Sequence, residues 1–383
     1  MNDTEQTLPS SGEEKIQSAR FAYSRALLHI VVYALFALVL RSIVYFILQK
    51  AGAAENLSPT LQYLVQFGPM YLGAFPLYLL VSKSLKADPP PKRSLSLPVM
   101  GTAFIVCEGL AITGALIGVI FTLIASALMR HDTTETFILE GVSGSGALFF
   151  TFLAAFCAPI IEEMLFRKVL IDRIRKYGDG TAILLSGIFF GLFHGNFMQC
   201  FFAAMLGMYF AYIYIRTGKV RYTIALHMII NSMSTIVAGY WLRALPEDAI
   251  SMFFSSDLQT MFFGFSFSSE LQNGIPAMTY LLEGLLQHRL NIAALADLSA
   301  NAPARVMLMS MPSLGGFAIQ SCFMYTNAIA GIVLLIRHRK TLRINPPEEA
   351  LPAHGNAKAV FTAVGFWALT GYCIWLFVRN LII

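Results

Sequence analysis

Apolar stretches recur along the chain and alternate with short polar connections. A helix that rises about 1.5 Å per residue needs about 20 residues to cross a hydrocarbon layer of about 30 Å. The alternation of apolar and polar positions that marks a membrane β-barrel is missing from these stretches. The pattern therefore predicts an all-α, polytopic membrane protein with about nine transmembrane helices, at residues 26–49, 60–82, 98–129, 146–174, 181–197, 199–216, 222–243, 313–336 and 358–379.

The same pattern divides the chain into five parts. Residues 1–25 are polar and lack the features of a cleaved signal peptide, so we expect a cytoplasmic N-terminus. Residues 26–129 form the N-terminal transmembrane helices, and residues 145–243 form a helical core. The apolar pieces of residues 244–312 are too short or too interrupted to cross, which indicates an extracytoplasmic loop. Residues 313–383 hold the C-terminal transmembrane helices.

Basic residues gather in every second connection, and acidic residues are found in the alternate ones. The positive-inside rule assigns the basic connections to the cytoplasm. With nine spans, this predicts a multi-pass protein of the cytoplasmic (inner) membrane with its N-terminus inside. The basic connections lie before the first span and at residues 83–93, 173–176, 216–221 and 337–343.

Composition supports a membrane protein and limits its partners. The chain is 56% hydrophobic and only 13% charged, whereas soluble domains are about a quarter charged. The net charge of +5 comes largely from the basic connections, so it indicates orientation in a lipid bilayer and no nucleic-acid partner. The five cysteines show no CxxC spacing and are interpreted as small apolar residues.

Ionisable residues within the predicted spans are few. A charge at the bilayer centre costs at least about 2.5 to 3.5 kcal/mol, so each such residue is a functional candidate. Three isolated cases, His29, Arg41 and Glu108, have no polar companions nearby and are predicted to be structural. The remaining candidates lie on three spans of the core: Glu162, Glu163 and Arg167 on the first, His194 on the second, and His227 with Asn231 on the third.

The two adjacent glutamates are not equivalent. Glu163 precedes Arg167 by four residues, the favourable order for an ion pair on a helix. Glu162 is rotated by about 100° from that pair and is free to face a cavity. Pro159 lacks an N–H donor and is expected to free a backbone carbonyl close to the site.

The candidates on the three spans lie at similar depths. Glu162, His194 and Asn231 are each roughly 15 to 20 Å from the predicted cytoplasmic ends of their helices, and His227 is about 9 Å from its end. A glutamate with a nearby histidine can deprotonate water, and His and Asn donors can stabilise the oxyanion of a tetrahedral intermediate. We therefore interpret these four residues as the catalytic residues of an amide hydrolase.

Three ordered motifs carry a resemblance to a known family. They are Glu162-Glu163-x-x-x-Arg167, Phe190-x-x-x-His194 and His227-x-x-x-Asn231, within about residues 145–240. In this order they resemble the CPBP family of CAAX-protease and bacteriocin-processing membrane peptidases, which includes the type II CAAX prenyl endopeptidase.

The resemblance implies an intramembrane endopeptidase and a role for each motif residue. Glu162 would activate water with help from His194, and His227 with Asn231 would form the oxyanion hole. The supporting residues would be Glu163 and Arg167, which orient Glu162, and Phe190, which shapes the pocket. The implied partner is a membrane protein or a lipidated peptide, either prenylated and of CAAX type or bacteriocin-like.

A second account of the same resemblance makes the protein a metalloprotease. In that account Glu162, His194 and His227 would bind a zinc-like divalent ion and Glu163 would be the base. Three such ligands plus water suit catalytic zinc. The cofactor is thus either none or a zinc-like metal, and we favour the metal-independent glutamate mechanism.

Other functions fit the sequence less well. The GxSG match at residues 141–144 falls in a predicted outer loop, paired intramembrane aspartates are missing, and no HExxH motif occurs. The alternative from a different class is a non-catalytic scaffold, immunity protein or transporter that uses the same polar cavity for binding. Such a protein should tolerate Gln at position 162, whereas a hydrolase needs the carboxylate.

Overall fold

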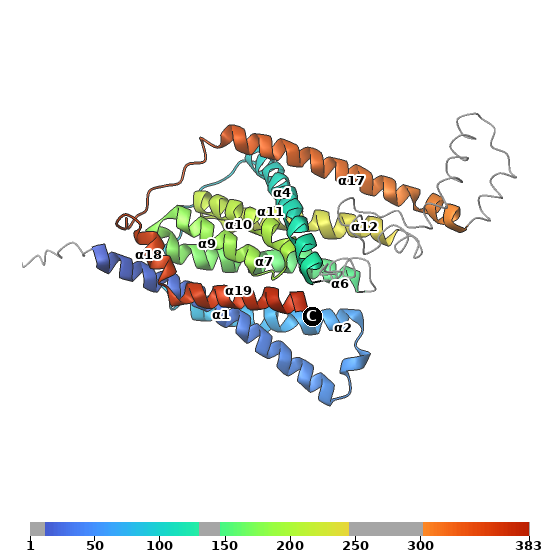
Figure 1. The fold of residues 1–383 in the computed structure, drawn as a ribbon, viewed down its shortest axis with the longest axis horizontal. Helices are drawn as coiled ribbons and strands as arrows, with labels where there is room; N and C mark the ends of the chain where they lie inside the picture. Colours follow the sequence, from blue (N-terminus) through green and yellow to red (C-terminus); the bar gives the residue numbers. More distant parts are fainter. Residues whose placement is uncertain (1–11, 130–145, 245–301, 383) are drawn as a thin grey trace, which may run out of the picture.

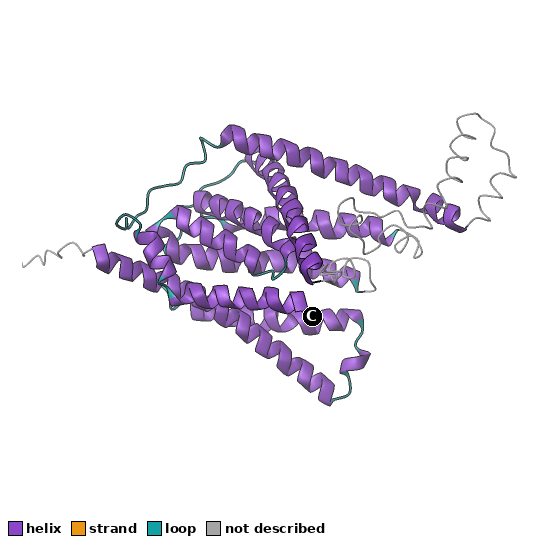
Figure 2. Cartoon of the chain, viewed as in Figure 1, coloured by secondary structure: helices purple, strands orange, loops and turns teal. Residues whose placement is uncertain are grey.

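The computed structural model describes residues 12–129, 146–244 and 302–382. Every regular element within these ranges is a helix (Figure 2), and eight helices are long and apolar enough to cross a membrane. The predicted fold class is confirmed. The GxSG match and most of the predicted outer loop lie outside the described residues.

The first half of the chain forms long helices. The N-terminal elements are α1 (Gly12–Lys50), η1 (Ala54–Asn56), α2 (Pro59–Gly68), η2 (Pro69–Ala74), α3 (Phe75–Ser82) and α4 (Leu97–Met129). Helix α1 extends into the residues predicted as a polar terminus, because Ile16, Ala19 and Tyr23 pack inside the protein. Helix α4 is continuous over 33 residues, so it must tilt to fit a layer of about 30 Å.

The core and the C-terminal part hold shorter and more broken helices. The core elements are α6 (Ala147–Phe152), η3 (Leu153–Cys157), α7 (Ala158–Glu163), η4 (Met164–Val169), α8 (Leu170–Ile174), η5 (Arg175–Tyr177), α9 (Asp179–Leu192), α10 (Phe197–Thr217), α11 (Val220–Ser232), η6 (Met233–Val237) and α12 (Ala238–Arg243). The last elements are α17 (Ala302–His338), α18 (Gly355–Phe361) and α19 (Val364–Ile382). Helix α17 thus begins before the predicted residue 313, and the break at residues 362 and 363 separates α18 from the last span.

One predicted span is shorter than the sequence pattern indicates. Helix α9 covers only 14 residues, or about 21 Å, and stops before a turn at Gly195, whose φ of 73° favours glycine. Asn196 then caps α10, because its side-chain oxygen accepts a hydrogen bond from the Gln199 N–H at 2.8 Å. The result is a tight hairpin of α9 and α10.

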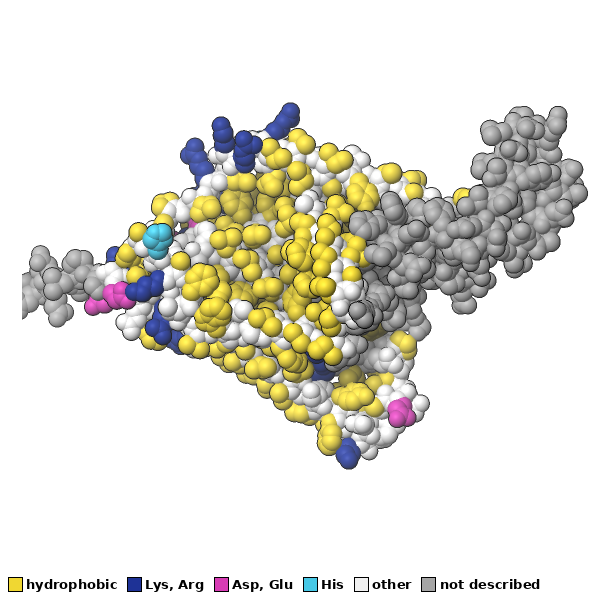
Figure 3. Space-filling model, in the orientation of Figure 1, with side chains coloured by type: hydrophobic (Ala, Val, Ile, Leu, Met, Phe, Trp, Pro, Cys, Tyr) yellow, Lys and Arg dark blue, Asp and Glu magenta, His cyan; other side chains and the backbone are white. Residues whose placement is uncertain are grey.

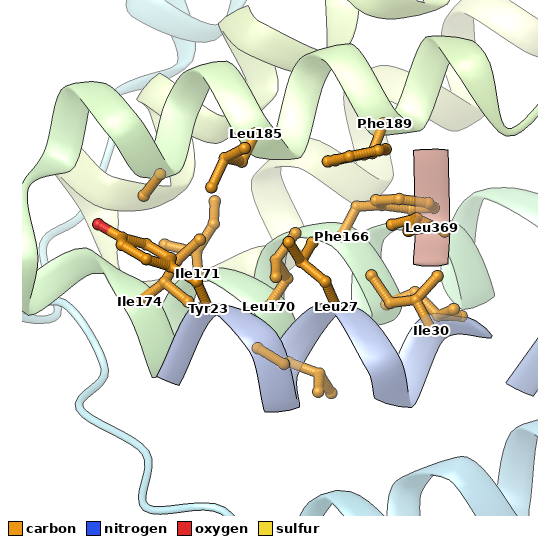
Figure 4. Close-up of a cluster of buried hydrophobic side chains, with 14 of the residues drawn as sticks. Tyr23, Leu27, Ile30, Phe166, Leu170, Ile171, Ile174, Leu185, Phe189 and Leu369 are labelled. Atoms are coloured by element: carbon orange, nitrogen blue, oxygen red, sulfur yellow. The ribbon is translucent and has the colours of Figure 1, made fainter. Parts of the chain in front are cut away.

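The helices of the core lie at the centre of the bundle. In Figure 1, α7, α9, α10 and α11 run roughly parallel to the long axis, with α1 and α19 on one side and α17 on the other. Figure 4 shows Leu27 and Ile30 of α1 pointing toward Phe166 and Leu170. Hydrophobic side chains cover most of the face seen in Figure 3, and the basic side chains lie mainly toward its margins, as expected for a lipid-facing surface.

Polar contacts hold the end of the bundle where α8 meets α9. Arg175 forms ion pairs with Asp88 at 3.4 Å and with Glu348 at 2.8 Å, so it joins two connections that are far apart in sequence. Asn345 donates a hydrogen bond to Asp179 at 3.1 Å and thereby fixes the start of α9. These contacts hold the hairpin that carries His194.

Candidate active site

Two π-helical turns surround the segment that carries both glutamates. Residues Leu153–Cys157 and Met164–Val169 are π-helical and flank the six-residue helix α7. π-turns are rare and often occur at functional sites. A π-helical turn holds about one residue more than an α-helical turn. The extra residue changes the direction in which the following side chains point. The local backbone therefore helps to set the directions of Glu162 and Glu163.

Pro159 frees a carbonyl, as its position indicates, and α11 supplies the missing donor. The Ala158 N–H bonds to the carbonyl of Leu153 five residues earlier, so the next carbonyl, of Ala154, would receive the N–H of residue 159. Proline has no N–H. Asn231 donates its side-chain N–H to the Ala154 carbonyl instead, at 2.9 Å. This bond joins α11 to the glutamate-bearing helix and leaves the second N–H of Asn231 for other partners.

Glu163 and Arg167 form a fully buried ion pair. Their side chains are 0% exposed, and Arg167 Nε lies 3.1 Å from Glu163 Oε2. The Arg167 guanidinium also lies over the rings of Phe190, at 4.3 Å, and Phe210, at 5.5 Å. Aromatic faces attract a cation, so both rings stabilise the buried charge. The predicted pairing of these two residues is present.

His227 connects the two glutamates. Its Nδ1 lies 3.1 Å from Glu163 Oε1, and its Nε2 lies 3.7 Å from Glu162 Oε2. The carboxylate of Glu163 accepts a hydrogen bond from Nδ1–H, which fixes the ring and directs Nε2 toward Glu162. Arg167, Glu163, His227 and Glu162 therefore form one continuous chain of polar contacts. Within it, Glu163 contacts His227 rather than Glu162.

Glu162 differs from its neighbour in exposure and surroundings. Its side chain is 29% exposed, against 0% for Glu163, and it lines an open pocket of about 620 Å³. The lining of this pocket is otherwise largely apolar, so Glu162 brings a carboxylate to a hydrophobic cavity.

His194 reaches the same pocket from α9. Its Nδ1 lies 2.8 Å from the Phe190 carbonyl oxygen. Because a carbonyl only accepts, Nδ1 carries the proton, and in the neutral ring Nε2 is a hydrogen-bond acceptor. The Phe190 ring lies beside those of both His194 and His227, with centroids 5.2 and 5.7 Å away. The three motifs thus meet around Phe190, whereas His227 and Asn231 are not among the residues that line the pocket.

The other wall of the pocket comes from α1 and η2, which the sequence pattern does not connect with the site. Tyr33 of α1 and Met70 and Tyr71 of η2 face Glu162 and His194 across the cavity. Tyrosines are frequent in membrane proteins near the lipid–water interface, so nothing in the sequence context of Tyr33 and Tyr71 marks them as functional. Only the packing of α1 and η2 against the core identifies them.

The isolated ionisable residues lie elsewhere. Glu108 of α4 is 1% exposed, and no described residue forms a hydrogen bond with its Oε2. Nδ1 of His29 similarly has no hydrogen-bond partner within the described ranges. Glu108, His29 and Arg41 do not line the pocket beside Glu162. Their predicted structural roles remain predictions.

The metal account of the sequence names Glu162, His194 and His227 as ligands. Each histidine gives one ring nitrogen to a carbonyl or a carboxylate, as zinc-binding histidines do. Among the residues described, however, no group of three His, Cys, Asp or Glu side chains is arranged to hold a metal ion.

The fold and the site together define a polytopic helical membrane protein with a buried polar centre, and comparison with known proteins shows which family its core resembles. Residues 144–233 match the family model described as type II CAAX prenyl endopeptidase Rce1-like. The match includes every residue of the three motifs, so the resemblance to the CPBP family is confirmed. This similarity is shown for that segment of the chain.

A curated relative agrees with the family match. The Bacillus subtilis (strain 168) protein named "Putative membrane peptidase YdiL" is 28% identical over 86 residues. The match covers 22% of this chain and 35% of the relative, so the chain spans about a third of the length of that protein. No solved structure matches the chain.

Proposed function

We propose that the protein is an intramembrane endopeptidase in which Glu162 activates the attacking water. The observation that carries the proposal is the contrast within the carboxylate pair. Glu163 is fully buried between Arg167 and His227, whereas Glu162 opens into the pocket. A carboxylate at a pocket wall beside histidine donors and acceptors is suited to general base catalysis.

The proposed reaction is the hydrolysis of one peptide bond. Water attacks the carbonyl carbon and gives a proton to the Glu162 carboxylate, so a tetrahedral oxyanion forms. The intermediate collapses when the C–N bond breaks, and protonated Glu162 gives its proton to the leaving amine. The products are a carboxylic acid and an amine, the acid passes its proton to the amine to give a carboxylate and an ammonium group, and Glu162 returns to its ionised form.

The neighbouring side chains have distinct proposed roles. His194 accepts a hydrogen bond from the water at Nε2, because its Nδ1–H is bonded to the Phe190 carbonyl. In its doubly protonated form His227 donates from Nε2 to the oxyanion, and Asn231 donates its second N–H. Glu163 and Arg167 hold His227 in position, and Phe190 supports both imidazole rings.

We further propose that catalysis needs no metal. The positions of Glu162, His194 and His227 support this, because the described residues offer no three-ligand group. The test is peptide cleavage after chelation, with metal content checked by elemental analysis. Full activity in metal-free protein supports the proposal, whereas loss of activity that returns with added zinc contradicts it.

The substrate and the topology also belong to the proposal. The pocket lies among membrane-spanning helices, which favours a membrane protein or a lipidated, CAAX-type or bacteriocin-like peptide as substrate. The basic connections favour a cytoplasmic N-terminus in the inner membrane. Cysteine labelling at positions 55 and 337 from either side of sealed vesicles tests this orientation.

A substrate trap tests the proposed activity. Wild-type protein and the Glu162→Gln variant are incubated in vesicles with prenylated CAAX and membrane-associated peptides, and new termini are identified by mass spectrometry. Wild-type protein should release products, whereas the variant should retain intact peptide. Glu55→Gln, which changes an exposed glutamate outside the site, is the matched control. Equal products from wild-type protein and Glu162→Gln would support the scaffold alternative.

A further inference from the structure

The pocket beside Glu162 has two walls of different origin. One wall, which includes Glu162, Phe166 and His194, belongs to the segment that matches the family. The opposite wall consists of Tyr33, Met70 and Tyr71, which precede that segment by more than 70 residues. Because the match begins at residue 144, the family resemblance gives no role to the second wall.

Packing fixes the second wall against the core. Leu27 and Ile30 of α1 are fully buried and pack among the core residues Phe166 and Leu170 (Figure 4). Tyr33 lies one turn beyond Ile30, and its ring lies edge-on to that of Tyr78, with centroids 5.6 Å apart. The position of Tyr33 opposite Glu162 is therefore set by close packing on both sides.

The π-helical segment η2 brings Met70 and Tyr71 to the same place. Pro69 begins this segment, and α1 is the element that packs most closely against it. A Cβ on Gly73 would lie 2.5 Å from Leu40 Cδ1, which shows that η2 packs directly against α1 at this position. The Tyr71 ring stacks on that of Phe67, at 6.0 Å. These contacts orient one side of η2 toward the pocket.

The chemistry of the second wall is mainly apolar, with two hydroxyl groups. Met70 has an unbranched, adaptable side chain that suits contact with varied apolar groups. Tyr33 and Tyr71 line the same cavity as Glu162, and each carries a hydroxyl group that can donate a hydrogen bond. The wall can therefore bind an apolar side chain and also donate hydrogen bonds to a peptide backbone.

We propose that Tyr33, Met70 and Tyr71 determine substrate specificity by binding a large apolar side chain next to the scissile bond. This inference rests on the proposed peptidase function. A peptide carbonyl within reach of Glu162 lies at the border of the pocket, so the side chain of an adjoining residue enters the cavity. The two tyrosine hydroxyls position the peptide backbone for attack.

Blocking the pocket tests the steric part of the proposal. The probes are two series of internally quenched peptides in detergent micelles, with Phe, Leu, Ala or Asp on either side of the scissile bond. Wild-type protein should prefer Phe or Leu at one of these positions. Met70→Trp should fill the pocket and lower kcat/KM for that peptide about tenfold relative to the Ala peptide. Leu72→Trp is the matched control, because Leu72 is 78% exposed on the same segment.

Removing the hydroxyls tests the polar part. Tyr33→Phe and Tyr71→Phe keep the rings and their packing, so each should raise KM for the preferred peptide several-fold while thermal stability is unchanged. Tyr45→Phe, at an exposed position of α1, should have no effect.

The outcomes separate this inference from the proposed function. If wild-type protein cleaves the peptides but Met70→Trp and both tyrosine variants keep its preferences and KM values, the inference is wrong and the peptidase assignment stands. If wild-type protein cleaves no peptide in either series, the proposed function is contradicted and the inference falls with it.

Discussion

The central and peripheral helices of this protein differ in what surrounds them. In the most apolar 18-residue stretch of α10, 50% is buried within the protein. In the corresponding stretch of the span Ala147–Tyr177, which carries both glutamates, 44% is buried. The corresponding shares are 11% for residues Pro59–Ser82 and 17% for Val364–Ile382. The charged site lies where its side chains are surrounded by protein rather than lipid. Protein groups can pair with the charges, which lowers the free-energy cost of placing them within the membrane. The same substitution should therefore act differently in the two regions.

The largest effect on stability is expected at Arg167. Arg167→Met leaves the fully buried Glu163 carboxylate without its cationic partner, so the free energy of unfolding should fall by about 3 to 5 kcal/mol. Thermal unfolding of the detergent-solubilised protein measures this loss. Arg337→Met, at an exposed position of α17, is the peripheral control and should change stability little. Adding Glu163→Gln to Arg167→Met should restore part of the loss, because no buried charge then remains unpaired. Equal effects of the two arginine substitutions would contradict the contrast between the regions.

Glycine substitutions should give the next largest difference. A Cβ on Gly191 would collide with the Cys200 carbonyl oxygen and lie 2.9 Å from the Ala204 backbone nitrogen, so Gly191→Ala should separate α9 from α10. Overpacking of this kind costs about 1 to 3 kcal/mol. Gly371→Ala on α19 meets no atom within 4 Å, and its higher helix propensity should leave stability unchanged or slightly improved. Unfolding temperatures of both variants provide the comparison, and similar losses would indicate that the hairpin is less closely packed than described.

A smaller effect is expected for the bond between Asn231 and Ala154. Asn231→Ala leaves the Ala154 carbonyl without a donor and should cost about 1 kcal/mol, as is usual for hydrogen bonds between membrane helices. Pro159→Ala provides a backbone N–H for that carbonyl. The cost of Asn231→Ala should therefore shrink in the Pro159→Ala background, which a double-mutant cycle of unfolding free energies detects. Additive effects would show that Pro159 does not create the need for Asn231.

The sequence predicts much of the fold because the length of an apolar stretch is a strong signal of a membrane-spanning helix. The predicted spans correspond to helices, and the i, i+4 spacing of Glu163 and Arg167 anticipates their ion pair. The short length of α9 is harder to predict, since the apolar run continues through the turn at Gly195. Periodicity alone does not reveal where a helix stops within an apolar run.

The sequence predicts which residues form the site but not which of them contact each other. The sequence groups Glu162, His194, His227 and Asn231 by depth, yet it does not indicate that Glu163 contacts His227. That contact depends on the direction of the helix between two π-turns, which has no clear sequence signal. Tyr33 and Tyr71 were missed because their position depends on which helices pack together.

The central claim is that Glu162 performs catalysis whereas Glu163 supports the structure. The most direct measurement is the rate constant for peptide cleavage by folded Glu162→Gln protein, with its unfolding temperature recorded on the same sample. The account predicts a loss of at least about 1,000-fold in rate with little change in stability, because the side chain opens into the pocket. Cleavage at the wild-type rate by the stable variant would contradict it.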